Sequence, residues 1–122
     1  MKHILYICTL ICLSLVLPAN CSAEVIFSLK YKDVKYVSVS PEMFGEYQVV
    51  IELMGPRQLE LARVTGSNVG DQIDIYISDT LIGKYPITVK VDSGFIVVGK
   101  YGSIDDAVSR IANILTGLNK SK

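Results

Sequence analysis

The chain has 122 residues, half of them hydrophobic, and its 12 basic side chains are balanced by 12 acidic ones. This length suits a single domain. The even mixture of charges excludes the strongly basic surface that nucleic-acid binding requires, so we expect no nucleic acid among the partners.

The first segment has the pattern of a secretory signal. A basic start at Lys2 precedes an apolar run over residues 4–17, which is too short to span a bilayer comfortably. Ala23 supplies a small residue where signal peptidase needs one, so we expect residues 1–23 to be removed. The mature protein is then exported to the periplasm.

A lipid anchor on Cys21 is the alternative outcome of this processing. The residues before it, Pro18-Ala19-Asn20, lack the small side chain normally wanted directly before a lipidated Cys. We therefore favour cleavage without lipidation.

Removal of residues 1–23 also removes every His and Cys of the chain. This excludes a thiol nucleophile, a Ser-His-Asp triad, a disulfide and nearly every structural zinc site. After the signal there is no second apolar run long enough for a membrane helix. We expect a mature protein without enzymatic activity, metal or cofactor.

The first part of the mature chain, residues 24–45, is expected to form a β-hairpin. Residues 25–31 and 34–40 both show extended, β-branched patterns, and Lys32-Asp33 between them suggests the turn. Residues 46–53 then alternate between apolar and polar side chains, which predicts a third strand.

A helix and a strand come next. Gly55-Pro56 opens the helix, whose apolar stripe includes Leu59 and Leu61, and glycines at 66 and 70 mark its end. Residues 72–78 alternate cleanly and predict a half-buried strand.

Two more strands and a helix are expected after residue 80. Residues 81–91 are expected to be extended, with Pro86 implying a sheet edge or a bulge, and residues 95–98 are apolar on both faces, as in a central strand. Ser103 with Asp106 forms a variant capping box ahead of an apolar helical stripe that ends near Gly117.

The order strand, helix, strand, strand, strand, helix over residues 46–118 predicts an α+β fold. We expect a ferredoxin-like two-layer sandwich, with a mostly antiparallel sheet and two helices on one face. The hairpin at residues 24–45 is expected to be an addition to this domain, which occupies residues 46–122.

Several short motifs occur in an order that resembles the first periplasmic domain of the SecD protein-export subunit. They are Val-Ile-Glu-Leu at 50–53, Leu-Ala-Arg-Val-Thr at 61–65, Asn-Val-Gly at 68–70, the strand closing at Asp79, then Pro86, Gly94, Gly99, Tyr101 and Ser103. The resemblance covers residues 46–117, the head portion of that domain. Departures are Thr80, where the family carries a turn Gly, and Gly83-Lys84.

The resemblance implies a periplasmic domain that touches polypeptides emerging from the Sec channel. In SecD this domain is followed by membrane helices that drive export, and this sequence carries none of them after the signal. We therefore expect a polypeptide-binding module near the Sec machinery, without motor activity.

Two other sites can be considered from the sequence. Asp71, Asp74 and Asp79 could support carboxylate chemistry, but they lie along one strand, with Asp74 on its solvent face, so a hydrolase is a weak alternative. The Gly-rich segment 65–70 could wrap an anion, but it precedes a strand and lacks a phosphate-loop Lys, so a helix end explains it better.

Tyrosines and an interrupted strand suggest where a partner binds. Amphipathic tyrosines favour protein interfaces, and a strand edge broken by Gly and Pro can accept an added strand. The candidate partner surface consists of Tyr76, Ile82, Lys84, Tyr85, Pro86 and Ile87. The alternative function is a specific inhibitor or adaptor that docks on one folded periplasmic protein.

Overall fold

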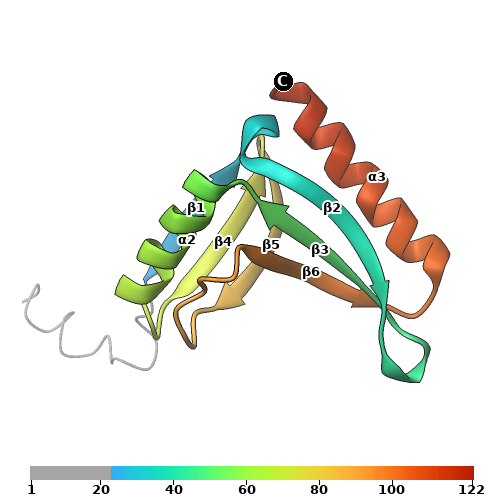
Figure 1. The fold of residues 1–122 in the computed structure, drawn as a ribbon, viewed down its shortest axis with the longest axis horizontal. Coiled ribbons are helices and arrows are strands. Elements are labelled where there is room, and N and C mark those ends of the chain that lie inside the picture. The colour runs from blue at the N-terminus through green and yellow to red at the C-terminus, as the bar shows by residue number, and fades with distance from the viewer. Residues whose placement is uncertain (1–22) are drawn as a thin grey trace, which may run out of the picture.

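The computed structural model describes residues 23–122, so the expected signal segment lies outside the described residues except for Ala23. The described chain folds into two sheets and two long helices (Figure 1). The elements are β1 (Glu24–Leu29), β2 (Val34–Pro41), β3 (Tyr47–Leu53), α2 (Gly55–Ser67), β4 (Gln72–Ile77), β5 (Thr80–Pro86), β6 (Phe95–Tyr101) and α3 (Ile104–Lys120), with short 3₁₀ helices η2 (Tyr31–Asp33) and η3 (Met43–Gly45).

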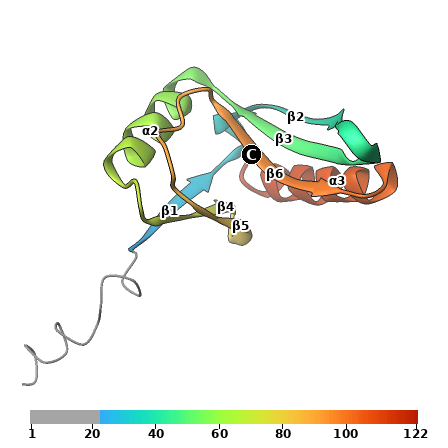
Figure 2. The same ribbon diagram turned by 90° about the horizontal axis from the view of Figure 1, so that it is seen from below.

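Each sheet has three strands, in the orders β1-β4-β5 and β2-β3-β6. β1 is parallel to β4, and the other pairings are antiparallel. The α+β sandwich with mostly antiparallel strands is thus confirmed. The strands, however, divide into two sheets that splay apart below η2, with α2 beside the first sheet and α3 behind the second (Figures 1 and 2).

The expected N-terminal hairpin is wrong. Both of its segments are strands, but β1 pairs with β4 and β2 pairs with β3. The turn between them is η2, where the Asp33 carboxylate accepts a hydrogen bond from the Lys30 amide, and it carries the chain from one sheet to the other. The alternation of apolar and polar residues predicts which face of a strand is buried, but it does not predict which other strand it pairs with.

One hydrophobic core lies between the two sheets and the helices. The central strands supply alternate side chains to it, as their period of two requires. Its best-buried members are Leu29, Val49, Ile51, Leu53, Ile75, Ile77, Ala107 and Ile114. Because β1 contributes Phe27 and Leu29 to this core, the N-terminal strand belongs to the same packed unit as the later ones.

Capping explains where the helices begin and end. The Ser103 hydroxyl accepts a hydrogen bond from the Asp106 amide at 3.2 Å, which confirms the predicted start of α3. α2 begins at Gly55 as expected and continues through Gly66 to Ser67. Leu59, expected in its apolar stripe, is exposed, and Thr65 is buried instead.

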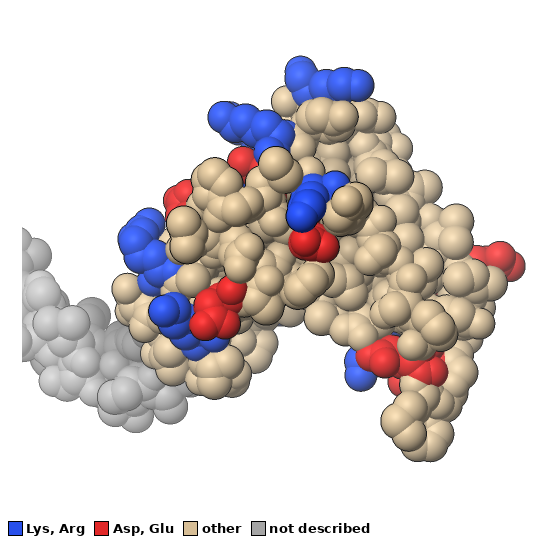
Figure 3. Space-filling view, viewed as in Figure 1, with Lys and Arg blue, Asp and Glu red and all other residues tan. Residues whose placement is uncertain are grey.

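The predicted central strand over residues 95–98 is wrong, because β6 is an edge strand. Ile96 and Val98 face the core, whereas Phe95 and Val97 lie on the solvent face of the sheet. There Val97 pairs with Val50, and Phe95 pairs with Glu52. The surface over β2, β3 and β6 is mostly uncharged in Figure 3, but it carries the ion pair between Lys35 of β2 and Glu52 of β3, 3.6 Å apart.

Candidate functional site

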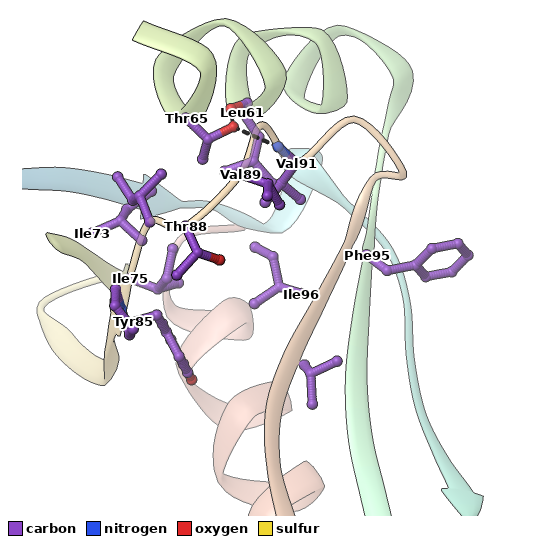
Figure 4. Close-up of a pocket in the computed structure, with 13 residues that line it drawn as sticks. Leu61, Thr65, Ile73, Ile75, Tyr85, Thr88, Val89, Val91, Phe95 and Ile96 are labelled. Atoms are coloured by element: carbon purple, nitrogen blue, oxygen red, sulfur yellow. Dashed lines mark hydrogen bonds between the residues drawn. The ribbon is translucent and has the colours of Figure 1, made fainter. Parts of the chain in front are cut away.

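An apolar cavity of about 190 Å³ opens between the two sheets beside α2 (Figure 4). Its walls come from α2, β4, the end of β5, β6 and the segment that links β5 to β6. The lining residues are Leu61, Thr65, Ile73, Ile75, Tyr85, Pro86, Ile87, Thr88, Val89, Val91, Phe95, Ile96 and Val97. This lining contains no carboxylate, amine, imidazole or thiol, so it is suited to holding an apolar group.

Two hydroxyl groups at the cavity wall, those of Thr65 and Tyr85, are hydrogen-bonded within the protein. The buried Thr65 hydroxyl donates to the Leu61 carbonyl at 2.7 Å and accepts from the Val91 amide at 2.8 Å. The Tyr85 hydroxyl donates to the Val98 carbonyl at 2.9 Å, which joins β5 to β6, and burial raises the pKa of this phenol. These bonds hold the walls in place, and they leave the apolar surfaces to meet a ligand.

The wall formed by residues 87–91 was not predicted. The sequence favours a strand as far as Val91, but β5 ends at Pro86 and the chain then crosses to the other sheet. Ile87 is fixed at the start of this segment by a bond from its amide to the Asp71 carbonyl. Pro86 and the turn residues 92–94 were the available signals, since Pro commonly ends strand pairing.

The structure divides the six candidate partner residues among three places. Tyr85, Pro86 and Ile87 line the cavity, and Ile82 packs against the core. The other two lie on the outer face of the β1-β4-β5 sheet, where Lys84 stands opposite Asp74 and Tyr76 is half-buried. As a binding surface they remain a prediction, and the cavity gathers three of them.

The edge of β5 is less open than a free strand would be. The Arg110 guanidinium, from α3, donates to the Ile82 carbonyl at 2.8 Å. Pro86 has no amide hydrogen to offer. An added strand along Ile82–Ile87 would therefore have to displace Arg110, which favours the cavity over the strand edge as the place where a partner binds.

Asp74 differs from its expected environment. It lies on the outer face of its sheet, as alternation predicted, but its residue is only 2% exposed. Its carboxylate accepts a hydrogen bond from the side-chain amide of Gln72 at 3.0 Å and pairs with the Lys84 ammonium at 3.4 Å. Lys84 also lies 3.8 Å from the Glu24 carboxylate.

This cluster shifts both of its central groups toward their charged forms. The hydrogen bond from Gln72 is the main cause that lowers the pKa of Asp74, with the Lys84 charge adding to it. The hydrogen bond and charge of Asp74 raise the pKa of Lys84. A carboxylate held ionised in this way serves as a structural ion pair, and it is poorly suited to general acid catalysis.

The remaining sequence candidates have structural roles. Asp71 accepts a bond from the Ala23 amide, and Asp79 is exposed at the turn between β4 and β5. Asn68 ends α2 by donating from its side chain to the Val64 carbonyl at 2.7 Å.

Within residues 23–122, no group of three or more His, Cys, Asp or Glu side chains lies close enough to hold a metal ion. No helix in the same range is long and apolar enough to cross a membrane.

Comparison with known proteins places this fold. No protein-family model matches the sequence, and no curated protein sequence matches it. Among solved structures, the chain is similar to SecDF, described as a membrane component that enhances protein export, with a TM-score of 0.58 and 22% sequence identity. The match covers 71% of this chain and 39% of that one, so this chain spans well under half of its length. At this identity the likeness establishes the fold, and the chain has a SecD-like α+β fold, as the order of its motifs predicted.

Proposed function

We propose that this chain is a non-catalytic, exported module that binds polypeptides and assists protein export or periplasmic folding. The observation that carries the proposal is the apolar cavity between the two sheets, in a fold that resembles part of an export protein. Polypeptides that are not yet folded expose aliphatic and aromatic side chains, which this cavity can accept. Association with the Sec machinery is part of the same proposal.

The size and chemistry of the cavity support one bound side chain. A cavity of about 150 Å³ lined by Leu, Ile and Phe can hold a benzene-sized molecule. The cavity here is somewhat larger, at about 190 Å³, and Ile73, Ile75 and Ile96 form its apolar floor. Recognition through one apolar side chain is tolerant of sequence, as a chain-binding accessory requires.

Photo-crosslinking from the cavity rim tests the proposal. In the full-length chain, benzoylphenylalanine replaces Val89, an exposed residue of the cavity wall, and cells are irradiated before capture under denaturing conditions. We expect many unrelated exported chains and Sec components to be attached. The control carries the same group at Leu59, an exposed position of α2, and should capture far less.

Two results would overturn the proposal. Equal capture from positions 89 and 59 would show that the cavity is not where chains bind. A single folded protein, attached in near-equal amount, would instead support the inhibitor or adaptor alternative. That alternative is supported by the turn between β2 and β3, where Met43 is 75% and Phe44 94% exposed.

A further inference from the structure

β6 forms an edge of its sheet, and this edge borders the cavity. β3 lies on one side of β6, and among the described strands none pairs with its other side. Phe95, Ile96 and Val97 of β6 line the cavity, as do Thr88 and Val89 of the opposite wall. Figure 4 shows Ile96 and Thr88 on opposite sides of it. A strand edge of this kind can accept a further strand, because its amides and carbonyls need hydrogen-bond partners.

The hydrogen-bond register shows which groups of β6 face this edge. The Leu53 amide of β3 donates to the Gly94 carbonyl at 2.9 Å, so the backbone of residue 94 faces β3. In an antiparallel pair, successive residues alternate between facing the partner strand and facing away from it. The backbone of Ile96 therefore faces β3, and the backbones of Phe95 and Val97 face the cavity side.

Three backbone groups on this side have no hydrogen-bond partner within residues 23–122. They are the Phe95 carbonyl and the amide and carbonyl of Val97. The groups on either side of them are used, since the Phe95 amide donates to the Ser93 hydroxyl at 3.2 Å and the Val98 carbonyl accepts from the Tyr85 hydroxyl at 2.9 Å. The open edge of β6, residues 95–97, is thus short, and it lies directly beside the cavity.

We propose that a bound polypeptide pairs with the open edge of β6 as an added strand and places one apolar side chain in the cavity. This inference rests on the proposed function, because it uses the same cavity and states how the chain is held there. An extended polypeptide is the occupant that fits, since its alternating amides and carbonyls match the three open groups. Backbone hydrogen bonds are the same for every sequence, so they give affinity, and the cavity selects the side chain.

Strand pairing would direct the correct side chain into the cavity. Residues that stand opposite each other in a sheet carry their side chains on the same face. Ile96 is buried and lines the cavity, whereas Phe95 and Val97 are 47% and 41% exposed. The chain residue opposite Ile96 would therefore point into the cavity, and its two neighbours would point into solvent. An aromatic or branched apolar residue between two polar ones satisfies both environments.

A matched pair of modified peptides tests the added strand. The probe is a dye-labelled peptide of seven residues, Ser and Thr with one Phe at the centre, and fluorescence anisotropy follows its binding to the full-length chain. Because alternate amides of a strand face opposite edges, N-methylation at peptide positions 3 and 5 blocks one edge, and N-methylation at positions 2 and 4 blocks the other. We expect one of these peptides to bind about tenfold more weakly than the other, since it loses the bonds to β6.

The outcomes separate this inference from the proposed function. Equal affinity of the two methylated peptides would overturn the added strand. If replacing the central Phe by Ser abolishes binding in that case, the cavity still binds chains, and the proposed function stands without the strand. If the unmodified peptide does not bind at about 1 mM, the inference is wrong, and crosslinking from Val89 decides the proposed function.

A proline substitution tests the same bonds from the side of the protein. Val97→Pro removes the open amide, and proline is tolerated on an edge strand where the N–H faces away from the partner strand. Binding of the peptide should weaken about tenfold. The matched control is Val39→Pro in β2, which pairs with Val49 and, by the same alternation, has its amide facing away from β3 at the far edge of the sheet.

The control should bind the peptide within about twofold of wild type, because β2 takes no part in the proposed pairing. Circular dichroism checks that both variants are folded. Wild-type affinity in a folded Val97→Pro variant would overturn the added strand. If Val97→Pro does not fold, the methylated peptides decide, since they leave the protein unchanged.

Discussion

The two three-stranded sheets share one core but differ in how their outer surfaces are finished. On the β1-β4-β5 sheet, the outer face holds the Asp74–Lys84 ion pair, and Arg57 and Arg110 cover carbonyls at the two edges. On the β2-β3-β6 sheet, the outer face exposes Phe95 and Val97 beside a more exposed ion pair, Lys35–Glu52, and β2 forms one edge of the sheet.

This difference indicates which parts of the molecule are structural and which are available for contacts. A covered edge and a paired charge resist association, because a partner would have to break bonds that already exist. An open edge and exposed apolar side chains favour association. The outer face of the β1-β4-β5 sheet therefore has a structural role, and the surfaces that we propose for contacts are the cavity between the sheets and the apolar side chains exposed on the other sheet.

The largest expected effect is a loss of stability on truncating the core, and it tests whether the two sheets unfold together. Ile75→Ala in β4 and Ile51→Ala in β3 each remove a fully buried side chain, and each should lower the free energy of unfolding by about 2–5 kcal/mol. Denaturation with urea, followed by circular dichroism and tyrosine fluorescence, should show one transition in both variants. Val97→Ala, on the exposed face, should change it by about 0.5 kcal/mol or less. Two separate transitions would show that the sheets unfold independently.

The second prediction concerns the acid stability of the support sheet. The pKa of Asp74 is lower in the folded chain than its ordinary value near 3.8, so its contribution to stability is present above that pH and disappears as the pH falls through the folded pKa. Asp74→Asn should therefore be less stable than wild type at pH 7 and should lose less stability on acidification below pH 4. Asp79→Asn, at an exposed turn, is the control and should follow wild type. If wild type and Asp74→Asn lose the same amount of stability on acidification, the Asp74–Lys84 ion pair does not contribute to acid stability.

Asp74 also shows how far a sequence pattern reaches. Alternation along residues 72–78 correctly predicted that Asp74 lies on the outer face of its strand. Its burial depends on Lys84 and Glu24, which come from the two neighbouring strands, and pairing between strands is not encoded in the alternation of one of them. For the same reason the sequence predicted the strands β1 and β2 but paired them wrongly.

The cavity could not be predicted from the sequence for a similar reason, because its wall depends on contacts between distant segments. Ile87, Val89 and Val91 alternate with polar residues as in a strand, but Ile87 is buried and Val91 packs against the core, whereas Val89 is exposed. Helix ends were more predictable, because the Ser103 cap and the Gly55-Pro56 start act within one turn of the chain. Local signals thus located the elements, and contacts between distant segments decided the site.

A smaller effect is expected at the link between the sheets. Tyr85→Phe removes the hydroxyl that donates to the Val98 carbonyl, and keeps the ring in the cavity wall. The free energy of unfolding should fall by about 1 kcal/mol, the usual net value of such a bond. Tyr76→Phe, for which no hydroxyl bond is expected to be lost, should change stability less. If Tyr85→Phe leaves both stability and hydrogen exchange of β6 unchanged, the link contributes nothing to holding the sheets together.

The smallest effect, and one of opposite sign, is expected at the turn between β2 and β3. Phe44 is 94% exposed and has a left-handed backbone with φ of 65°, followed by Gly45 with φ of 76°. A left-handed residue costs about 1–2 kcal/mol, and glycine avoids that strain but adds about 0.5–1 kcal/mol of chain entropy to the unfolded state.

Phe44→Gly should therefore raise the free energy of unfolding by about 0.5 kcal/mol, the net of those two terms. Ser78→Gly provides the contrast, because Ser78 has φ of 55° but its hydroxyl bonds to Gly117, so this variant should lose stability. Both are measured by urea denaturation. If Phe44→Gly is stabilising, the aromatic ring is held in solvent at a cost to the fold, which is expected of a side chain retained for contact with another molecule. If it is destabilising, Phe44 stabilises the fold despite its exposure, and this turn is then a structural part of the β2-β3-β6 sheet.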